Sequence, residues 1–294
     1  MGKIVVVGIG PGSFEDMTPR ARHAIESAQV VAGYKTYIGL IEPLLEGKEV
    51  IGTGMTQEVD RCRAAVEAAA SGKDTVVVSS GDSGVYGMAG LVLELVLQLP
   101  KEQRPEWGGV VAGVSAVNAA ASILGAPLMH DFAVISLSDW MTPWELIKKR
   151  AALAGEGDFV IALYNPKSRH RPDYIFEIQK ILLQHRSPDT PVGIVTSASR
   201  AKEQAVLSDL GHFTEEEIGM FSMVIIGNSN TYVQDGYMIT RRGYKIAGKG
   251  GFDGRESFCG GRHQGWQGAG RIYIAAGLSG DGIGGEQLWG KPAE

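Results

Sequence analysis

Gly8-Ile9-Gly10-Pro11-Gly12 follows directly on the apolar run from Ile4 to Val7, and this is the stretch of sequence that decides the fold. A short apolar run of β-branched residues is typical of a buried strand, and glycines let the backbone turn sharply where the strand ends. In open parallel sheets, ligands bind beside the carboxyl ends of the strands. The pattern therefore predicts an α/β fold with a ligand-binding loop after its first strand.

A second glycine-rich loop, Ser79-Ser80-Gly81-Asp82-Ser83-Gly84-Val85-Tyr86-Gly87, ends another expected strand at Thr75 to Ser79. The carboxyl ends of parallel strands meet at the same edge of a sheet, so we expect both loops to face one cleft. In an alternative interpretation, Asp82 caps the helix that follows.

The first loop does not match the common nucleotide-binding motifs. The dinucleotide fingerprint needs a third glycine where this chain has Ser13, and Pro11 stiffens the loop. The second expected strand continues to Tyr34 without the acidic residue that binds a ribose. The sequence also lacks the glycine spacing of a Walker loop, so an NAD oxidoreductase is disfavoured.

Short β-branched runs alternate with amphipathic segments, which predicts strands joined by crossover helices. The expected strands are Ile4 to Val7, Gln29 to Ala32, Thr75 to Ser79, Val110 to Val111, Phe132 to Ser136, Phe159 to Tyr164, Val192 to Thr196 and Phe221 to Ile226. Helices are expected after Thr18, from Thr56 to Ala70, after Pro143 and after Asp173.

These elements predict an α/β protein of two αβ lobes with a cleft between them. We expect an N-terminal lobe over residues 1–125 and a C-terminal lobe over 126–248, with the hinge at 125–130, where Pro127 interrupts the pattern. Residues 249–294 are rich in glycine and poor in apolar residues, so we expect them to form a mobile tail.

Composition excludes several classes of function. A net charge of -5 over 294 residues argues against a nucleic-acid partner, because phosphate binding needs a basic excess. The apolar run at the N-terminus is too short for a signal sequence or a membrane span, which predicts a cytoplasmic protein without a membrane partner. Cys62, Cys259 and His263 lack the spacing of a metal or iron-sulfur site, so no metal is expected.

Together with further motifs in the same order, the two loops resemble those of the tetrapyrrole methylases, over about residues 1 to 245. The further motifs are Gly113-Val114-Ser115-Ala116, Leu163-Tyr164-Asn165-Pro166, Val192 to Ala198 and Met223 to Asn228. The resemblance implies a two-lobed cleft that binds S-adenosylmethionine, a corrinoid tetrapyrrole substrate and a homodimer.

Within this family, the segments Ala32 to Ile38, Gly54 to Thr56, Ser80 to Gly87 and Tyr164 to Arg169 are most similar to the C17-methyltransferase branch of cobalamin biosynthesis. That branch methylates C17 of precorrin-3B or cobalt-factor III, with coupled ring contraction. Methylation at another corrin position remains an alternative, as does a non-catalytic module that binds the tetrapyrrole or the methyl donor.

The resemblance also implies roles for individual residues. The cofactor site is expected to include Gly10, Pro11, Gly81, Asp82, Val85, Ser115, Ala116, Tyr164, Asn165, Thr196 and Ala198. A substrate with many carboxylates calls for a basic rim, for which Lys167, Arg169 and Arg171 are the first candidates. Lys35, Arg61 and Arg200 are among the basic residues that could join this rim. Ring contraction requires proton transfer, and Tyr34, Lys35 and His130 are the expected catalytic residues.

Overall fold

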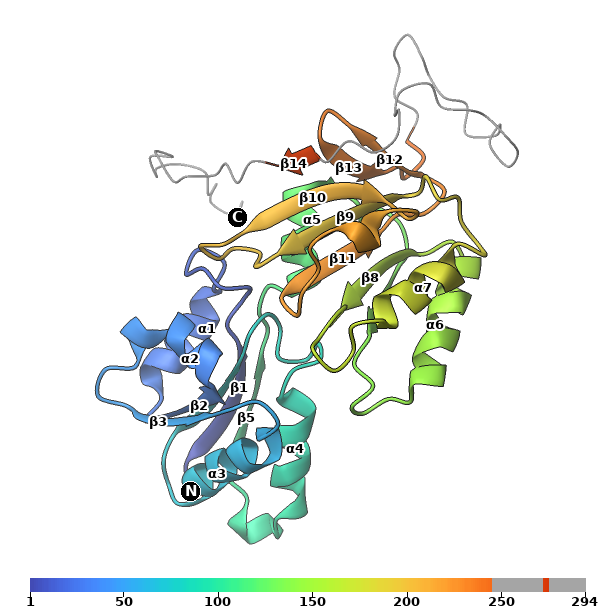
Figure 1. Ribbon diagram of the computed structural model, residues 1–294. Helices are drawn as coiled ribbons and strands as arrows, with labels where there is room; N and C mark the ends of the chain where they lie inside the picture. Colours follow the sequence, from blue (N-terminus) through green and yellow to red (C-terminus); the bar gives the residue numbers. More distant parts are fainter. Residues whose placement is uncertain (245–271, 275–294) are drawn as a thin grey trace, which may run out of the picture.

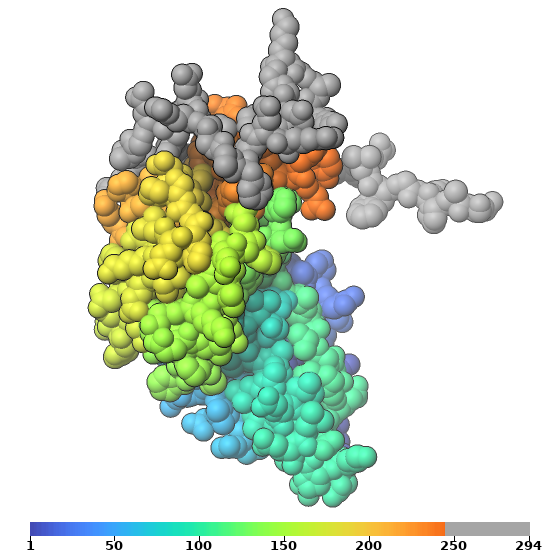
Figure 2. Space-filling view, turned by 90° about the vertical axis from the view of Figure 1, so that its right-hand side faces the viewer, coloured from blue at the N-terminus to red at the C-terminus, as the bar shows by residue number. Residues whose placement is uncertain are grey.

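The protein consists of two α/β lobes, each built on its own sheet. The computed structural model describes residues 1–244 and the backbone of residues 272–274. In the space-filling view, the N-terminal part (blue to teal) forms the lower half and the following part (green to orange) the upper half (Figure 2). Within the described residues, no helix is both long and apolar enough to cross a membrane. The expected mobile tail at 249–294 lies outside the described residues, except for 272–274.

A parallel sheet forms the N-terminal lobe. Its strands are β1 (Lys3–Gly8), β2 (Val30–Tyr34), β3 (Glu49–Thr53), β4 (Thr75–Ser79) and β5 (Glu106–Val111). They lie in the order β3-β2-β4-β1-β5, and each neighbouring pair is parallel (Figure 1). The helices are α1 (Pro19–Ser27), α2 (Lys35–Leu40), α3 (Glu58–Ala70) and α4 (Ala89–Gln98), with 3-10 turns η1 (Glu42–Leu44) and η2 (Lys101–Gln103).

Helices cover both faces of this sheet. One face packs against α3 and α4, where Val6 and Val77 meet Cys62 and Val92. The other face packs against α1 and the segment after it, with Ile25 fully buried. Because both faces are covered, the central strands are apolar throughout, as is typical of a parallel sheet.

A mixed sheet forms the second lobe. Its strands are β7 (Phe132–Ser136), β8 (Val160–Tyr164), β9 (Pro191–Thr196), β10 (Gln204–Asp209), β11 (Ser222–Ile226) and β14 (Ile272–Ile274), in the order β14-β10-β9-β11-β8-β7. Only β7 and β8 form a parallel pair, and the other pairs are antiparallel. Helices α6 (Trp144–Glu156) and α7 (Tyr174–Leu182) cover one face, and η3 (Phe213–Glu215) adds Phe213 to the same core.

Helix α5 (Ala116–Leu124) covers the opposite face of the second sheet, with Val117, Ala120 and Leu124 in its core. We expected the lobe boundary at residue 125, after this helix. In the structure the chain leaves the first lobe after β5, so α5 already belongs to the core of the second. Strands β6 (Gly125–Ala126), β13 (Tyr237–Thr240) and β12 (Thr231–Gln234) form a small third sheet. Part of the expected hinge is therefore a paired strand.

The expected α/β fold and each predicted strand are confirmed, with β5 longer than expected. The helix predicted from Thr56 to Ala70 is present and ends at Ala70, but it begins at Glu58 rather than Thr56, which adopts a left-handed φ of 65°. The sequence analysis also missed β3, β10, β12 and β13. Strand β3 carries few buried residues, which leaves little periodic signal in its sequence.

Arg186 links three elements of the second lobe at the end where β8 begins. Its guanidinium donates to the backbone carbonyls of Ala154, Phe159 and Gly227. Burial lowers the pKa of this guanidinium. Because the carbonyls come from the end of α6, the start of β8 and the end of β11, one side chain ties these elements together.

Candidate functional site

The two glycine-rich loops bond directly to each other. Gly10 N donates to Gly81 O over 3.1 Å, and Gly81 N donates to Gly10 O over 2.7 Å. The approach is close, since a Cβ on Gly8 would lie 2.7 Å from Gly81 O and 2.8 Å from Gly113 N. The expectation that both loops meet at one edge of the sheet is thereby confirmed.

Asp82 joins this pair of loops to the segment after β5. Its Oδ1 accepts from Gly84 N over 2.8 Å, and its Oδ2 accepts from Gly113 N over 2.9 Å. The alternative in which Asp82 caps the next helix is wrong, because α4 begins at Ala89 and has Met88 at its N-cap. The carboxylate instead fixes the shape of the loops at the edge of the sheet.

A cavity of about 180 Å³ lies where these loops face the second lobe. The N-terminal lobe contributes Pro11, Tyr37, Ser80, Gly81, Asp82, Val85 and Tyr86. The second lobe contributes Ala116, Tyr164, Asn165, Val195, Ser197, Ala198, Arg200, Met220, Phe221, Ser222 and Met223. The lining is a mixture of apolar and aromatic surface with a few polar groups, as is typical of small-molecule sites.

Backbone strain is concentrated at this cavity. Tyr86, Asn165 and Ser197 line it with left-handed φ values of 53°, 52° and 56°, and Ser199 next to it has 57°. Non-glycine residues in this region cost free energy and persist where the surrounding structure holds them, which is common at ligand sites. The left-handed residues therefore favour this cavity as the functional site.

Two tyrosines connect the lobes across the cavity. The rings of Tyr86 and Tyr164 lie 5.2 Å apart. Tyr86 Oη donates to Val134 O over 3.1 Å, and Tyr164 Oη accepts from Val117 N over 3.1 Å. Burial raises the pKa of both phenols above the ordinary value, so both hydroxyls are protonated at neutral pH.

Most of the expected cofactor residues lie at the cavity. The structure places Pro11, Gly81, Asp82, Val85, Ala116, Tyr164, Asn165 and Ala198 in its lining. Gly10 does not line the cavity but is hydrogen-bonded to Gly81, which does. Ser115 is the N-cap residue of α5 and lies beside Tyr164. Thr196 lines a different hollow and shares a hydrogen bond with Ser222, whereas its neighbour Ser197 lines the cavity.

The expected substrate residues follow β8 but differ in their surroundings. Arg171 is engaged by the protein: it donates to Leu137 O over 3.0 Å and to Ser168 Oγ over 3.2 Å, and lies 3.8 Å from Asp139. Lys167 Nζ stands 5.7 Å above the Phe176 ring. Arg169 is exposed. Lys167 and Arg169 are thus more available to a ligand than Arg171.

The expected catalytic residues do not line the cavity. His130 is exposed and precedes the first residue of β7, whereas the cavity lies at the carboxyl end of the neighbouring β8. Lys35 is exposed at the start of α2. The ring of Tyr34 packs edge-on against Tyr37 at 5.1 Å, and Tyr37 is the tyrosine of that segment that reaches the cavity.

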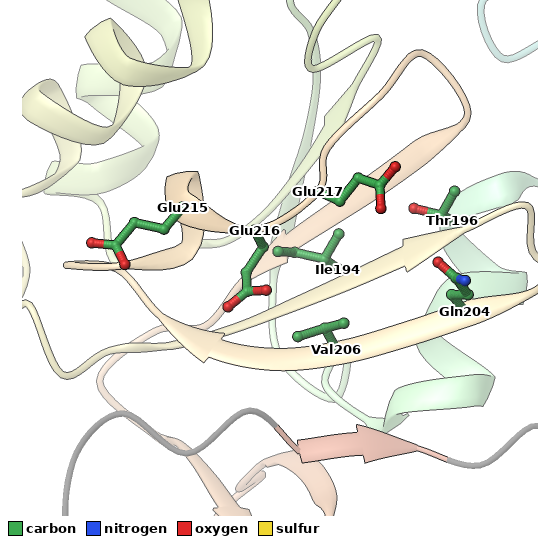
Figure 3. Close-up of a pocket in the computed structure, with 7 residues that line it drawn as sticks. All are labelled: Ile194, Thr196, Gln204, Val206, Glu215, Glu216 and Glu217. Carbon is green, nitrogen blue, oxygen red and sulfur yellow. The ribbon is translucent and has the colours of Figure 1, made fainter.

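A second hollow, of about 320 Å³, lies over β9 and β10. It is lined by Ile194, Thr196, Gln204, Val206, Glu215, Glu216 and Glu217 (Figure 3). The three carboxylates point in different directions, so they do not converge on one ion. No group of metal-ligating side chains occurs among the residues that the structure describes.

The fold and the cavity define a class of protein: a two-lobed α/β protein that holds a small-molecule ligand between glycine-rich loops and a mixed sheet. The family model of the tetrapyrrole (corrin/porphyrin) methylases matches residues 3–214. The chain belongs to this family, which confirms the resemblance found in its sequence.

Individual relatives agree with this assignment. Over 247 residues the chain is 53% identical to a cobalt-factor III methyltransferase of Priestia megaterium, covering 83% of this chain and 45% of that one. It is 51% identical to a probable cobalt-factor III C(17)-methyltransferase of Salmonella typhimurium, covering 82% of this chain and 99% of that one. Among solved structures, that of the methyltransferase CobJ matches with a TM-score of 0.78 and 34% identity, over 82% of this chain and all of that one.

Proposed function

We propose that the protein transfers a methyl group from S-adenosylmethionine to C17 of cobalt-factor III or precorrin-3B, with coupled ring contraction, in cobalamin biosynthesis. The observation that carries the proposal is the cavity itself, in which two mutually bonded glycine loops face Tyr164, Asn165 and Ala198 of the second lobe. The names of the Priestia and Salmonella relatives support the substrate. The chain spans less than half of the Priestia relative, whose remaining part has no counterpart in this match.

The residues of the cavity fit a sulfonium nucleoside. Asn165 Nδ2 donates to Ser136 Oγ over 2.9 Å, which orients the amide oxygen as an acceptor for a ligand amino or hydroxyl group. The hydroxyls of Ser80 and Ser197 and the peptide groups of the glycine loops add further donors and acceptors. When bound, S-adenosylmethionine supplies an electrophilic methyl group that the electron-rich macrocycle attacks.

The chain's own contribution to methyl transfer is alignment, which does not require a nucleophilic side chain. The strained residue Tyr86 is held by its hydrogen bond to Val134 O of the second lobe, and Asn165 by its bond to Ser136 Oγ, so both side chains keep defined positions at the cavity. For ring contraction, the protonated phenol of Tyr164 is available as a proton donor at the cavity, whereas Tyr86 already donates its proton to Val134 O.

The proposal assigns the macrocycle to the outer part of the cleft. Lys167 and Arg169 follow β8 directly and are free to pair with its carboxylates, whereas Arg171 serves to hold the loop at Asp139. Tyr34 and Lys35 do not line the cavity but are still proposed to take part in proton transfer. His130 is not proposed for this role. As the family resemblance implies, the enzyme is further proposed to be a cytoplasmic homodimer, which sedimentation velocity and cell fractionation test.

Methyl transfer is tested by incubating the purified chain with S-adenosylmethionine and either cobalt-factor III or metal-free precorrin-3B, and measuring product mass and absorbance. Gain of one methyl group with either substrate supports the proposal and identifies the route. Binding of donor and macrocycle without a gain in mass would favour the non-catalytic module, and a methyl group at a carbon other than C17 would favour another ring position.

A matched pair of variants ties the activity to the cavity. Val85 lines the cavity and is 37% exposed, while Val59 on α3 is 42% exposed and does not line it. Val85→Trp adds bulk at the cavity and is expected to abolish donor binding and methyl transfer. Val59→Trp makes the same change elsewhere and is expected to leave both unchanged. Equal activity in the two variants would contradict this placement of the active site.

A further inference from the structure

Arg200 crosses from the second lobe to the glycine loops of the first. It lies on the connection between β9 and β10, and its Nε donates to Pro11 O over 2.8 Å. One Nη donates to Ser80 Oγ over 3.0 Å, and the guanidinium carbon stands 5.6 Å from the Phe221 ring centroid. The side chain passes over Gly12, where a Cβ would lie 2.5 Å from Arg200 Cγ. The glycine is therefore needed for this crossing.

The charge of Arg200 is not balanced by the protein. Its hydrogen-bond partners are a carbonyl and a hydroxyl, and within the described residues no carboxylate lies within 4.0 Å of its guanidinium. Burial lowers its pKa. A partly desolvated cation without a counter-ion is costly, and the cost falls when an anion binds.

Nearby carboxylates are already committed to backbone donors. Asp82 accepts from Gly84 N and Gly113 N, and Glu203 accepts from Ser199 N over 2.6 Å. Neither is placed to neutralise Arg200. The bonds to Pro11 and Ser80 use one side of the guanidinium, and its remaining N–H groups have no acceptor in the part of the chain that the structure describes.

Tyr37 is a second donor at the same cavity as Arg200. Both residues line the cavity, and the charge of Arg200 acts on the Tyr37 phenol. Burial raises the pKa of that phenol, so its hydroxyl is a donor at neutral pH. A guanidinium fork and a hydroxyl donor in one cavity supply the donors that a carboxylate accepts from.

From this unpaired fork at the cavity wall, we propose that Arg200 binds a carboxylate of a ligand, either that of the methyl donor's amino-acid end or one on the tetrapyrrole. The inference rests on the proposed function, because both ligands come from it. Arg200 belongs to the second lobe but is held by Pro11 and Ser80 of the first, so the bound anion would lie where the two lobes meet.

Calorimetric titration of the full chain tests the inference with three ligands. S-adenosylhomocysteine carries the donor's carboxylate, 5′-methylthioadenosine is the same nucleoside without it, and cobalt-factor III carries the carboxylates of the macrocycle. The variants are Arg200→Gln, Arg200→Lys and the control Lys202→Gln, which removes an exposed cation from the same connection. Arg200→Lys keeps the charge but lacks the planar fork, so it carries the comparison even where Arg200→Gln folds poorly.

If the donor is the source of the carboxylate, Arg200→Gln weakens S-adenosylhomocysteine by about 10- to 100-fold and leaves methylthioadenosine unchanged. If the tetrapyrrole is the source, the nucleosides bind as in the wild type and cobalt-factor III weakens by a similar factor. In both cases Arg200→Lys lies between wild type and Arg200→Gln, and Lys202→Gln matches the wild type.

The inference is overturned if the Arg200 variants bind all three ligands as the wild type does. It is overturned equally if the only change is a matching loss of both nucleosides, since that indicates a structural role in holding Pro11. Wild-type protein that binds neither the nucleosides nor the tetrapyrrole would refute the proposed function and this inference with it.

Discussion

Replacing Asp82 with alanine should loosen the paired loops, and the structure sets the size of the effect. The carboxylate accepts two N–H bonds, and a hydrogen bond to a charged group contributes about 1.5–3 kcal/mol. Gly84 is exposed, so water replaces much of its bond, whereas Gly113 is only partly exposed. We therefore expect Asp82→Ala to lower the free energy of unfolding by about 2–3 kcal/mol.

Urea unfolding of Asp82→Ala and Asp82→Asn, with S-adenosylhomocysteine affinity measured alongside, checks this expectation. Asparagine keeps one acceptor oxygen for two N–H groups, so it should cost about half as much as alanine. The control is Asp60→Ala on α3, a carboxylate that is 75% exposed. The reasoning is refuted if Asp82→Ala is no more destabilising than Asp60→Ala and binds the nucleoside as tightly as the wild type.

Further predictions concern groups outside the cavity. Arg186→Met leaves its carbonyl partners without their donor, and guanidinium denaturation should show a loss of about 3 kcal/mol; a loss under about 0.5 kcal/mol would count against the tie described above. The Asp209 carboxylate raises the pKa of His212, so wild type should exceed His212→Gln in stability most below about pH 6.5, and the difference should vanish as pH rises through the folded pKa. An opposite slope in pH-dependent melting would contradict this. Burial raises the pKa of Cys62 to about 11, so in a Cys259→Ser background a disulfide reagent at pH 8 should label the thiol only on unfolding.

The loops after β1 and β4 could be predicted because two signals coincide there. An apolar β-branched run marks each strand, and glycines mark the turn that follows it. Since parallel strands present the same end to the same edge, the meeting of Gly10 and Gly81 followed from topology alone. Pro11 and Asp82 lie on these two loops, so their place in the cavity lining could be predicted as well.

Other parts of the cavity depend on tertiary placement that no local pattern encodes. Ser197 rather than Thr196 faces the cavity, because a difference of one residue at the end of a strand reverses the side to which the side chain points. Tyr37 is brought in by the orientation of α2, and Arg200 by the length of the β9–β10 connection. Thr56 has the composition of a helix cap, but its left-handed backbone overrides that preference.

The reciprocal hydrogen bonds between Gly10 and Gly81 have a consequence for anyone who recombines this protein with its relatives. Each loop supplies the hydrogen-bond partners of the other, so a chimera that exchanges one loop alone would pair it with a loop from a different protein. The natural exchangeable unit is discontinuous: it comprises both loops and the Gly113 segment that Asp82 ties to them, although more than seventy positions separate Gly10 from Gly81 in the chain. Crossover points for hybrid enzymes are better placed after Gly113 than between the first strand and the fourth.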